Sequence, residues 1–146
     1  MVKAAYSCGK PALGVGAGNV PAYVEKSANI RQAAHDIVMS KSFDNGMVCA
    51  SEQAVIIDKE VYDEFVEEFK SYHTYFVNKK EKALLEEFCF GAKANSKNCA
   101  GAKLNPDIVG KPATWIAEQA GFSVPEDTNI LAAECKEVGE KEPLTR

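Results

Sequence analysis

One thiol stands out in this sequence because of its neighbours. The stretch Ser42–Gln53 contains an Asp-Asn-Gly triplet at residues 44–46, and Cys49 follows the glycine by three residues. Asp, Asn and Gly favour tight turns. A thiol held at such a turn on a rigid scaffold has the surface position that a nucleophile needs. Free cysteines are also commonly buried and inert, so position alone leaves both interpretations open.

Two elements must position this turn. Before it, Asn29 is typical of a helix N-cap, and Gln32 stands at the capping-box position. The apolar residues that follow have helical spacing, which predicts a helix with one buried face that ends near Phe43. They are Ile30, Ala33, Ala34, Ile37 and Val38. After the turn, Ala54–Ile57 is fully apolar, as expected of an interior parallel strand.

The rest of the chain predicts strands that alternate with helices. We expect strands at 12–15, which would be buried, at 22–24 and at 129–133, and a short helix at 2–8 that ends at Gly9. Further helices are expected after an Asp58 cap, at 79–90, and from Pro112 to Gly121. Residues 91–105 indicate a connection and 134–146 a weakly patterned tail. The alternation indicates an α/β fold with a mainly parallel sheet.

Three of these helices have predicted inward faces. The helix after Asp58 would bury Val61, Phe65 and Phe69. The helix at 79–90 would bury Leu84, Leu85 and Phe88. The helix that ends at Gly121 carries Trp115, Ile116 and Ala120.

Composition narrows the function classes. The 146 residues suffice for one domain with a core. A net charge of -4 gives no electrostatic reason to expect a nucleic acid or an anionic membrane as partner, and no apolar run approaches the roughly 20 residues of a membrane span. Five cysteines without a CxxC pair argue against a disulfide framework and against a zinc site. We therefore expect no bound metal and a reducing, cytoplasmic location.

The glycines at 14, 16 and 18 resemble part of a dinucleotide-binding loop. That loop requires a helix immediately after the glycines, whose N-terminus faces the pyrophosphate. Here Pro21 and the apolar Ala22–Val24 favour a strand instead. We therefore assign no cofactor-binding residue to this chain.

Three separated motifs carry a resemblance to a known family. They are Gly9–Pro21, Phe43–Gln53 and Gly121–Pro125, and the likeness extends over essentially all 146 residues. In order and spacing they resemble the aldehyde dehydrogenase superfamily. Within it they are most similar to the CoA-acylating branch, and to the aldehyde dehydrogenase half of bifunctional aldehyde-alcohol dehydrogenases.

The resemblance implies a fold and a domain organisation. It implies a three-layer α/β/α catalytic domain of the aldehyde dehydrogenase type, present here in incomplete form. Residues 1–10 would be the tail helix of a missing NAD-binding domain, and residues 11–146 part of the catalytic domain. The bifunctional enzymes of this family form filaments, so a homo-oligomer or filament is expected of the full-length protein.

The resemblance also implies a reaction. Cys49 would attack an aldehyde carbonyl, a hydride would pass to NAD, and coenzyme A would take the acyl group from the Cys49 thioester. Aldehyde and acyl-CoA would be the substrates, acetaldehyde and acetyl-CoA first among them, and NAD would be bound mainly by segments outside this chain. Hydrolytic relatives have a water-activating glutamate where Val15 stands. Valine cannot accept a proton, which favours transfer to a thiol over hydrolysis.

Other candidate residues receive structural interpretations. Cys8, Cys89, Cys99 and Cys135 share no pattern and are expected to be structural or incidental. His35 and His73 are not adjacent to Cys49 in the sequence, and we favour a structural hydrogen-bonding role for Glu52 over an acid–base role. Two alternatives remain open for the chain: a non-catalytic structural or assembly fragment of the same enzyme, and a redox-sensing thiol protein.

Overall fold

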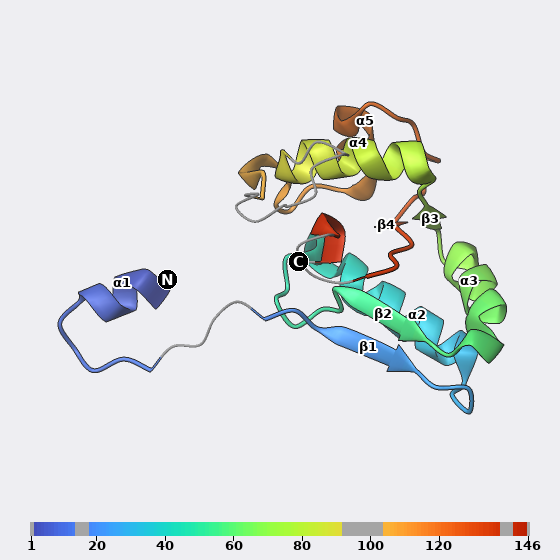
Figure 1. Cartoon of the computed structure of the whole chain (residues 1–146), viewed down its shortest axis with the longest axis horizontal. Helices are drawn as coiled ribbons and strands as arrows, with labels where there is room; N and C mark the ends of the chain where they lie inside the picture. The colour runs from blue at the N-terminus through green and yellow to red at the C-terminus, as the bar shows by residue number, and fades with distance from the viewer. Residues whose placement is uncertain (1, 14–17, 92–103, 138–141, 146) are drawn as a thin grey trace.

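The fold begins with a short helix and continues as strands that alternate with helices (Figure 1). The computed structural model describes residues 2–13, 18–91, 104–137 and 142–145. Its helices are α1 (Val2–Ser7), α2 (Ile30–Ser42), α3 (Tyr62–Ser71), α4 (Lys79–Phe90) and α5 (Ala113–Ala120). Its strands are β1 (Pro21–Val24), β2 (Ala54–Ile57), β3 (Thr74–Phe76) and β4 (Ile130–Ala132). Short 3-10 helices are η1 (Phe43–Gly46), η2 (Lys59–Val61), η3 (Pro106–Ile108) and η4 (Pro143–Thr145).

The described strands pair in parallel, as the alternation predicted. β1 pairs with β2 from Pro21 opposite Ala54 to Val24 opposite Ile57, and α2 makes the crossover between them. β3 pairs with β4 from Thr74 opposite Ile130 to Phe76 opposite Ala132. Within the described residues these are two separate two-stranded sheets. The α/β class is therefore confirmed, and each sheet contains one pair of strands within the described residues.

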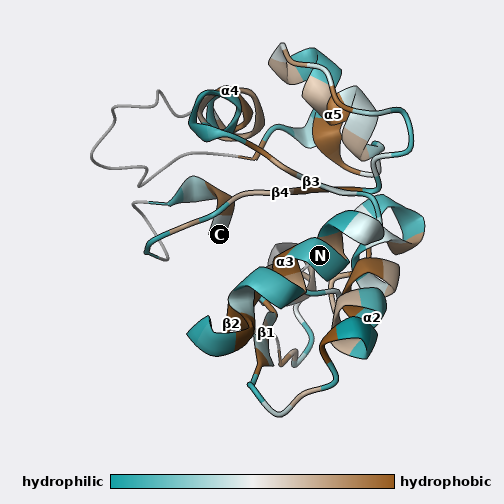
Figure 2. Cartoon of the chain, turned by 90° about the vertical axis from the view of Figure 1, so that its right-hand side faces the viewer, coloured by the Kyte–Doolittle hydropathy of each residue, from teal (hydrophilic) through white to brown (hydrophobic). Residues whose placement is uncertain are grey.

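The larger core lies where α2 and α3 pack beside β1. α2 has the predicted N-cap, because the Asn29 side chain accepts a hydrogen bond from the Gln32 backbone N–H. α3 contributes Phe65 and Phe69, whose ring centroids lie 4.6 Å apart. The other buried residues of this cluster are Val24, Ile30, Ala34, Ile37 and Val38. The helices show hydrophilic colours on one side and hydrophobic colours on the other, as their sequence periodicity requires (Figure 2).

A smaller core lies between α4 and α5. Leu85, Cys89 and Ala120 are its buried members, and Phe88, Ile116 and Phe122 pack against them. α4 begins at a complete capping box, in which Asn78 and Glu81 each bond the other's backbone N–H. Both helices end at a glycine with positive φ, Gly91 at 62° and Gly121 at 96°, a backbone conformation that glycine adopts without strain. The predicted bounds of both helices are therefore confirmed.

The helix α1 lies apart from both cores (Figure 1). It ends one residue before the predicted position, and Gly9 follows with a φ of 72°. Among the described helices, none combines the length and the apolar character that a membrane crossing requires.

Some sequence predictions of local structure were wrong. Ala12 and Leu13 form no strand, and Leu13 is fully exposed, while Gly14–Ala17 lies outside the described residues. Asp58 does not cap α3, because its carboxylate accepts from the Tyr23 hydroxyl at 2.7 Å and from the Lys26 N–H at 3.0 Å. Tyr23 lies on β1 and Lys26 shortly after it, so the local sequence around Asp58 gives no indication of either contact.

Three further details differ from expectation. The Gln32 side chain does not close a capping box, because it reaches forward to Asp36 at 2.7 Å. Leu84 is exposed, whereas Leu85 is buried as predicted. Ile56 of β2 is 55% exposed, so the expected interior strand has an open face among the described residues. The sequence also gave no signal for β3, whose three residues follow α3 almost directly.

Candidate functional site

Cys49 lies on a strained turn between α2 and β2. Asp44 and Asn45 both have φ of 51°, a left-handed conformation that costs most residues energy and that Asp and Asn tolerate best. Gly46 follows with a φ of 73°. Three consecutive left-handed residues reverse the chain sharply, and the thiol arrives three residues later. We call residues 43–53 the nucleophile turn, after the role that the sequence predicts for Cys49.

Polar contacts close the nucleophile turn around Cys49. The Ser51 backbone N–H and hydroxyl both donate to the Val48 carbonyl, at 3.0 Å and 2.8 Å. Ser51 is only 1% exposed, so this clasp is shielded from water. The backbone N–H of Gln53 donates to the Val20 carbonyl at 2.8 Å. This bond ties the end of the turn to the residue before β1.

A second segment supports the turn from across the fold. The Asn45 amide donates to the Gly110 carbonyl at 3.0 Å. Gly110 has a φ of 73°, and a Cβ there would lie 2.9 Å from the Met47 sulfur. Only glycine fits this close approach without a shift of Met47. The loop before α5 therefore holds the nucleophile turn at Asn45 and Met47.

The thiol and its apolar neighbours face outward. Cys49 is a free, exposed cysteine. Phe43, Met47 and Val48 are also exposed, at 67%, 55% and 37%. Exposed large apolar side chains close in sequence to an exposed thiol are typical of a surface that binds a small molecule or another protein segment. The geometry thus gives Cys49 the accessibility that a nucleophile needs.

The side chain of Lys41, at the end of α2, contacts the nucleophile turn. The sequence analysis did not predict this contact. Lys41 Nζ donates to Gln53 Oε1 at 3.3 Å. Burial lowers the pKa of Lys41, and the Glu52 carboxylate opposes that shift. Glu52 is partly buried, and its Oε2 has no hydrogen-bond partner among the described residues. The signal available in the sequence was position alone: a lysine in the last turn of the helix that leads to the thiol.

The other cysteines occupy different environments. Cys8 is exposed at the end of α1, and its thiol donates to the Ala5 carbonyl at 2.9 Å. Cys89 is buried in the α4–α5 core, and burial raises its pKa to about 11. Cys135 is half-buried, and Cys99 lies outside the described residues. Cys89 is therefore packed as a core side chain, in agreement with the structural or incidental role predicted for it.

The ring nitrogens of both described histidines pair with carboxylates outside the nucleophile turn. His35 Nδ1 lies 3.0 Å from Asp36 Oδ1, and its ring meets the Tyr72 ring edge-on at 5.4 Å. His73 has a φ of 63°, and its Nδ1 lies 2.8 Å from Asp127 Oδ2. His35 thus pairs with its neighbour on α2 and with Tyr72 after α3, and His73 pairs with Asp127.

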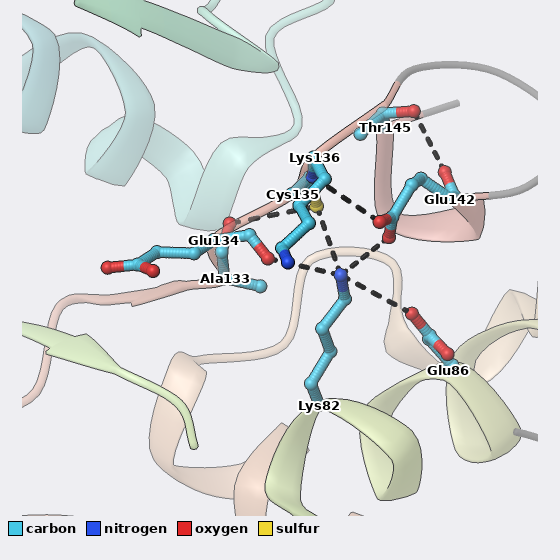
Figure 3. Close-up of polar contacts among 8 residues, drawn as sticks. All are labelled: Lys82, Glu86, Ala133, Glu134, Cys135, Lys136, Glu142 and Thr145. Atoms are coloured by element: carbon cyan, nitrogen blue, oxygen red, sulfur yellow. Dashed lines mark hydrogen bonds and ion pairs between the residues drawn. The ribbon is translucent and has the colours of Figure 1, made fainter. Parts of the chain in front are cut away.

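A second polar cluster surrounds Lys82 (Figure 3). Lys82 Nζ lies 2.5 Å from Glu142 Oε2, 3.1 Å from the Glu134 carbonyl and 3.4 Å from Cys135 Sγ. Glu86 Oε1 is 4.0 Å away. Burial lowers the pKa of Lys82, but Glu142 and Cys135 outweigh it, and the net pKa is raised. Burial raises the pKa of Cys135 although Lys82 opposes it.

A hollow of about 230 Å³ lies at the start of α2, lined by Asn29, Arg31, Gln32, His35 and Tyr72. Cys49 follows the other end of α2, so this hollow is not a substrate site for its thiol. Among the residues that the structure describes, no group of His, Cys, Asp and Glu has the arrangement of a metal site.

Known proteins resemble the chain throughout. The model of the "Aldehyde dehydrogenase family" matches residues 1–103. An aldehyde-alcohol dehydrogenase of Streptococcus pneumoniae serotype 4 is 95% identical over 146 residues, which cover all of this chain and 16% of that protein. This chain therefore spans only a small part of that relative's length.

Solved structures agree with the sequence match. An acetylating aldehyde dehydrogenase of Geobacillus thermoglucosidasius superposes with a TM-score of 0.85 at 45% identity, over 98% of this chain and 30% of that one. A propionaldehyde dehydrogenase of Rhodopseudomonas palustris, solved with bound CoA and an acylated cysteine, gives a TM-score of 0.75 at 33% identity, over 98% of this chain and 30% of that one. The fold therefore matches part of the fold of acylating aldehyde dehydrogenases.

Proposed function

This chain belongs to the aldehyde dehydrogenase family, and on that premise we propose that it is the nucleophile-bearing part of an NAD-dependent, CoA-acylating aldehyde dehydrogenase. The observation that carries the proposal is Cys49, an exposed free thiol on a turn braced by Ser51 and Asn45. The Rhodopseudomonas palustris relative, which holds CoA and an acylated cysteine, supports this chemistry.

The proposed reaction uses the Cys49 sulfur twice. As a thiolate it attacks the aldehyde carbonyl carbon, which forms a C–S bond and places negative charge on the carbonyl oxygen. In this family the backbone N–H of the nucleophile, here that of Cys49, stabilises such an oxyanion. Loss of a hydride from the same carbon leaves a thioester on Cys49. The thiolate of CoA then attacks that thioester, and Cys49 leaves as a thiolate.

NAD supplies the hydride acceptor when bound. The described residues form no strand–glycine loop–helix unit of the dinucleotide-binding type. We propose that NAD is bound mainly by an NAD-binding domain outside this chain, with residues 1–10 as its tail helix and 11–146 as part of the catalytic domain. The position of α1 apart from both cores is consistent with this division (Figure 1).

The acyl acceptor follows from Val15, which lies outside the described residues. A general base is worth roughly 10²–10⁴-fold in rate, so its loss strongly disfavours hydrolysis. A thiol acceptor depends less on a general base than water does, since a few per cent of the thiol is already ionised near pH 7. We propose CoA as the acceptor, acetaldehyde and acetyl-CoA as the main substrate pair, a homo-oligomer or filament as the assembly, and the cytoplasm as the location.

The test is Cys49→Ser in the full-length enzyme. Serine is a far weaker nucleophile at neutral pH, so turnover in both directions should fall by about 10³-fold or more while NAD binding is retained. Acyl-CoA and free acid should be quantified together, with Cys8→Ser as the matched control for an exposed thiol. Near-normal turnover in Cys49→Ser would disprove the nucleophile, and free acid as the main product at saturating CoA would disprove the acceptor.

A further inference from the structure

A loop between α4 and α5 reaches across the fold to the nucleophile turn. It comprises residues 104–111 and contains η3, and we call it the η3 loop. The Asn45 side-chain amide donates to the Gly110 carbonyl of this loop at 3.0 Å, although 65 positions separate the two residues in the sequence. The backbone of Gly110 also comes close to Met47, because a Cβ there would lie 2.9 Å from the Met47 sulfur. Two residues of the turn therefore meet one residue of the loop.

The η3 loop is itself fixed to both helices of the smaller core. The Asn105 backbone N–H donates to the Cys89 carbonyl at the end of α4, at 2.7 Å. Ile108 packs against the α4–α5 cluster. At the other end of the loop, the Lys111 ammonium lies over the Trp115 ring of α5, 5.2 Å from the ring centroid. The position of the loop is therefore set by α4 and α5.

Cys49 lies between two fixed points of the backbone. On its N-terminal side, the nucleophile turn is held by the contacts with the η3 loop. On its C-terminal side, the Gln53 N–H donates to the Val20 carbonyl at 2.8 Å. Between these points, the Ser51 hydroxyl donates to the Val48 carbonyl at 2.8 Å and closes the short turn that contains Cys49. Without the first fixed point, the direction of Cys49 would be set from one side only.

We infer that Asn45 and Gly110 are positioning residues for the reaction of Cys49, and that the η3 loop orients the backbone around the thiol through their hydrogen bond. The inference rests on the proposed function, because it concerns the same thiol. The attack requires the Cys49 sulfur and the Cys49 N–H to meet one carbonyl group at the same time. A misplacement of about 1 Å can cost about 10²-fold in rate, so a bond that fixes the turn four residues before the thiol affects turnover.

The backbone conformation of Asn45 decides which variants test this bond. Its φ of 51° lies in the left-handed region, which glycine adopts without strain. Asn45→Gly therefore removes the amide and leaves the conformation of the turn accessible. The adjacent Asp44 has the same φ of 51° and is also exposed. Asp44→Gly introduces the same flexibility while the Asn45–Gly110 bond stays in place, so it is the matched control.

The experiment measures kcat and KM of the full-length enzyme, with kcat expressed per NAD-binding site so that unfolded protein does not count. Asn45→Gly should lower kcat by about tenfold to 10²-fold with a change in KM below about threefold, since orientation and not substrate binding is lost. Asp44→Gly should lose far less. The rate at which iodoacetamide alkylates Cys49 should stay within about threefold of wild type, because alkylation needs an accessible thiol but no aligned N–H.

A double variant tests whether the two residues act through one contact. Gly110 has a φ of 73°, which alanine adopts only with strain, so Gly110→Ala should displace the Gly110 carbonyl and also lower kcat. Once that contact is broken, the second change has nothing further to remove. Asn45→Gly combined with Gly110→Ala should therefore be about as slow as the slower single variant. Losses that multiply would overturn the inference, because they would mean two independent effects.

Equal losses of kcat in Asn45→Gly and Asp44→Gly would also overturn the inference, as would a wild-type kcat in Asn45→Gly. If Asn45→Gly does not fold, Asn45→Asp decides, because it keeps the size of the side chain and tolerates the left-handed conformation but cannot donate to a carbonyl. A loss of kcat above about threefold in Asn45→Asp supports the inference, and a smaller loss overturns it. The proposed function fails separately, through an active Cys49→Ser variant.

Discussion

The two halves of the chain each contain a cysteine and a partly buried lysine, in different arrangements. In the Cys49 half (residues 18–73) the thiol is exposed on a turn, and the Lys41 ammonium bonds the Gln53 side chain at the end of that turn. In the Lys82 half (residues 74–91, 104–137 and 142–145) the ammonium lies 3.4 Å from the Cys135 sulfur, yet burial raises the pKa of that thiol. Closeness to a cation therefore does not by itself make a nucleophile.

The difference lies in what else each lysine binds. Lys82 already has Glu142 at 2.5 Å and the Glu134 carbonyl at 3.1 Å, so its charge is largely neutralised before it acts on Cys135 (Figure 3). The Lys41 ammonium instead donates to the neutral side-chain amide of Gln53. The Lys82 half thus places its cation among several acceptors, whereas the Lys41 ammonium bonds an uncharged amide at the end of the nucleophile turn.

The largest effect should distinguish the two cores. Phe65 is 1% exposed within the larger cluster, so Phe65→Ala should lower the free energy of unfolding by about 3–5 kcal/mol. Leu85→Ala, in the smaller α4–α5 cluster, should cost less, near 2 kcal/mol, because its partly exposed neighbours can relax into the space. Urea denaturation measures both, with exposed Leu84→Ala as the control. A larger loss for Leu85→Ala than for Phe65→Ala would contradict this ranking of the cores.

The next effect compares thiol reactivity between the halves. With a pKa of about 11, Cys89 is ionised to about one part in 10³ at pH 8, and it is also buried. Cys49 should therefore be alkylated at least about 100-fold faster than Cys89 at that pH. Timed alkylation with peptide mass spectrometry measures the two rates in one sample. Equal rates would mean that the two halves do not differ in the way described, and would favour a general thiol sensor over a dedicated nucleophile.

The two halves also differ in how far the sequence predicted them. In the Cys49 half, local signals sufficed for the main elements: the Asn29 cap, the helical spacing up to Ser42, the Asp-Asn-Gly turn and the apolar β2 run. The motif also identified Cys49, whose exposure the structure then showed. The roles of Lys41 and Asp58 depend on partners 12 and 35 residues away, which no local pattern reveals.

In the Lys82 half, the helix bounds were predictable but the contacts were not. Capping residues and glycines marked α4 and α5 correctly. β3 was missed, because its three residues acquire strand geometry only by pairing with β4, 56 residues further along the chain from Thr74 to Ile130. The Lys82 cluster joins residues separated by 53 and 60 positions. Lys82 was predicted only to lie within a helix, and Cys135 and Glu142 only to lie in a weakly patterned tail.

A smaller effect should separate the two N-caps. Asn78 accepts from two backbone N–H groups and belongs to a complete capping box, whereas Asn29 accepts from one. Asn78→Ala should therefore lower the free energy of unfolding by about 1–2 kcal/mol, and Asn29→Ala by about 0.5–1 kcal/mol. Each variant should be compared with its Asn→Ser counterpart, which retains a capping oxygen and should lose only a few tenths of a kcal/mol. The reverse order of the two alanine variants would show that the extra box bond carries no stability.

The smallest effect concerns the dependence of stability on pH in the Lys82 half. Burial alone would raise the pKa of Glu142, but its bonds to Lys82 and to the Lys136 N–H hold that pKa below its ordinary value of 4.5. A carboxylate with a lowered pKa stabilises the fold above its unfolded pKa, and that stabilisation is lost as the pH falls through the folded pKa. The wild type should therefore lose about 1 kcal/mol from this group as the pH falls below about 4.5.

Lys82→Met should reverse this slope. Without the Lys82 ammonium, the partly buried carboxylates of Glu142 and Glu86 lose their nearby cation. Burial already raises the pKa of Glu86. The folded pKa values of both carboxylates would then lie above the unfolded ones, so the variant should be less stable at pH 7 and should recover part of that loss as the pH falls from about 6 to 4. Urea midpoints across that range measure both slopes. Lys82→Arg should retain the wild-type slope, since it keeps the charge. Lys41→Met should also leave this slope unchanged, because it removes a cation from the other half of the chain. Parallel slopes for the wild type and Lys82→Met would show that Lys82 does not neutralise the cluster, and the contrast drawn with Lys41 would then fail.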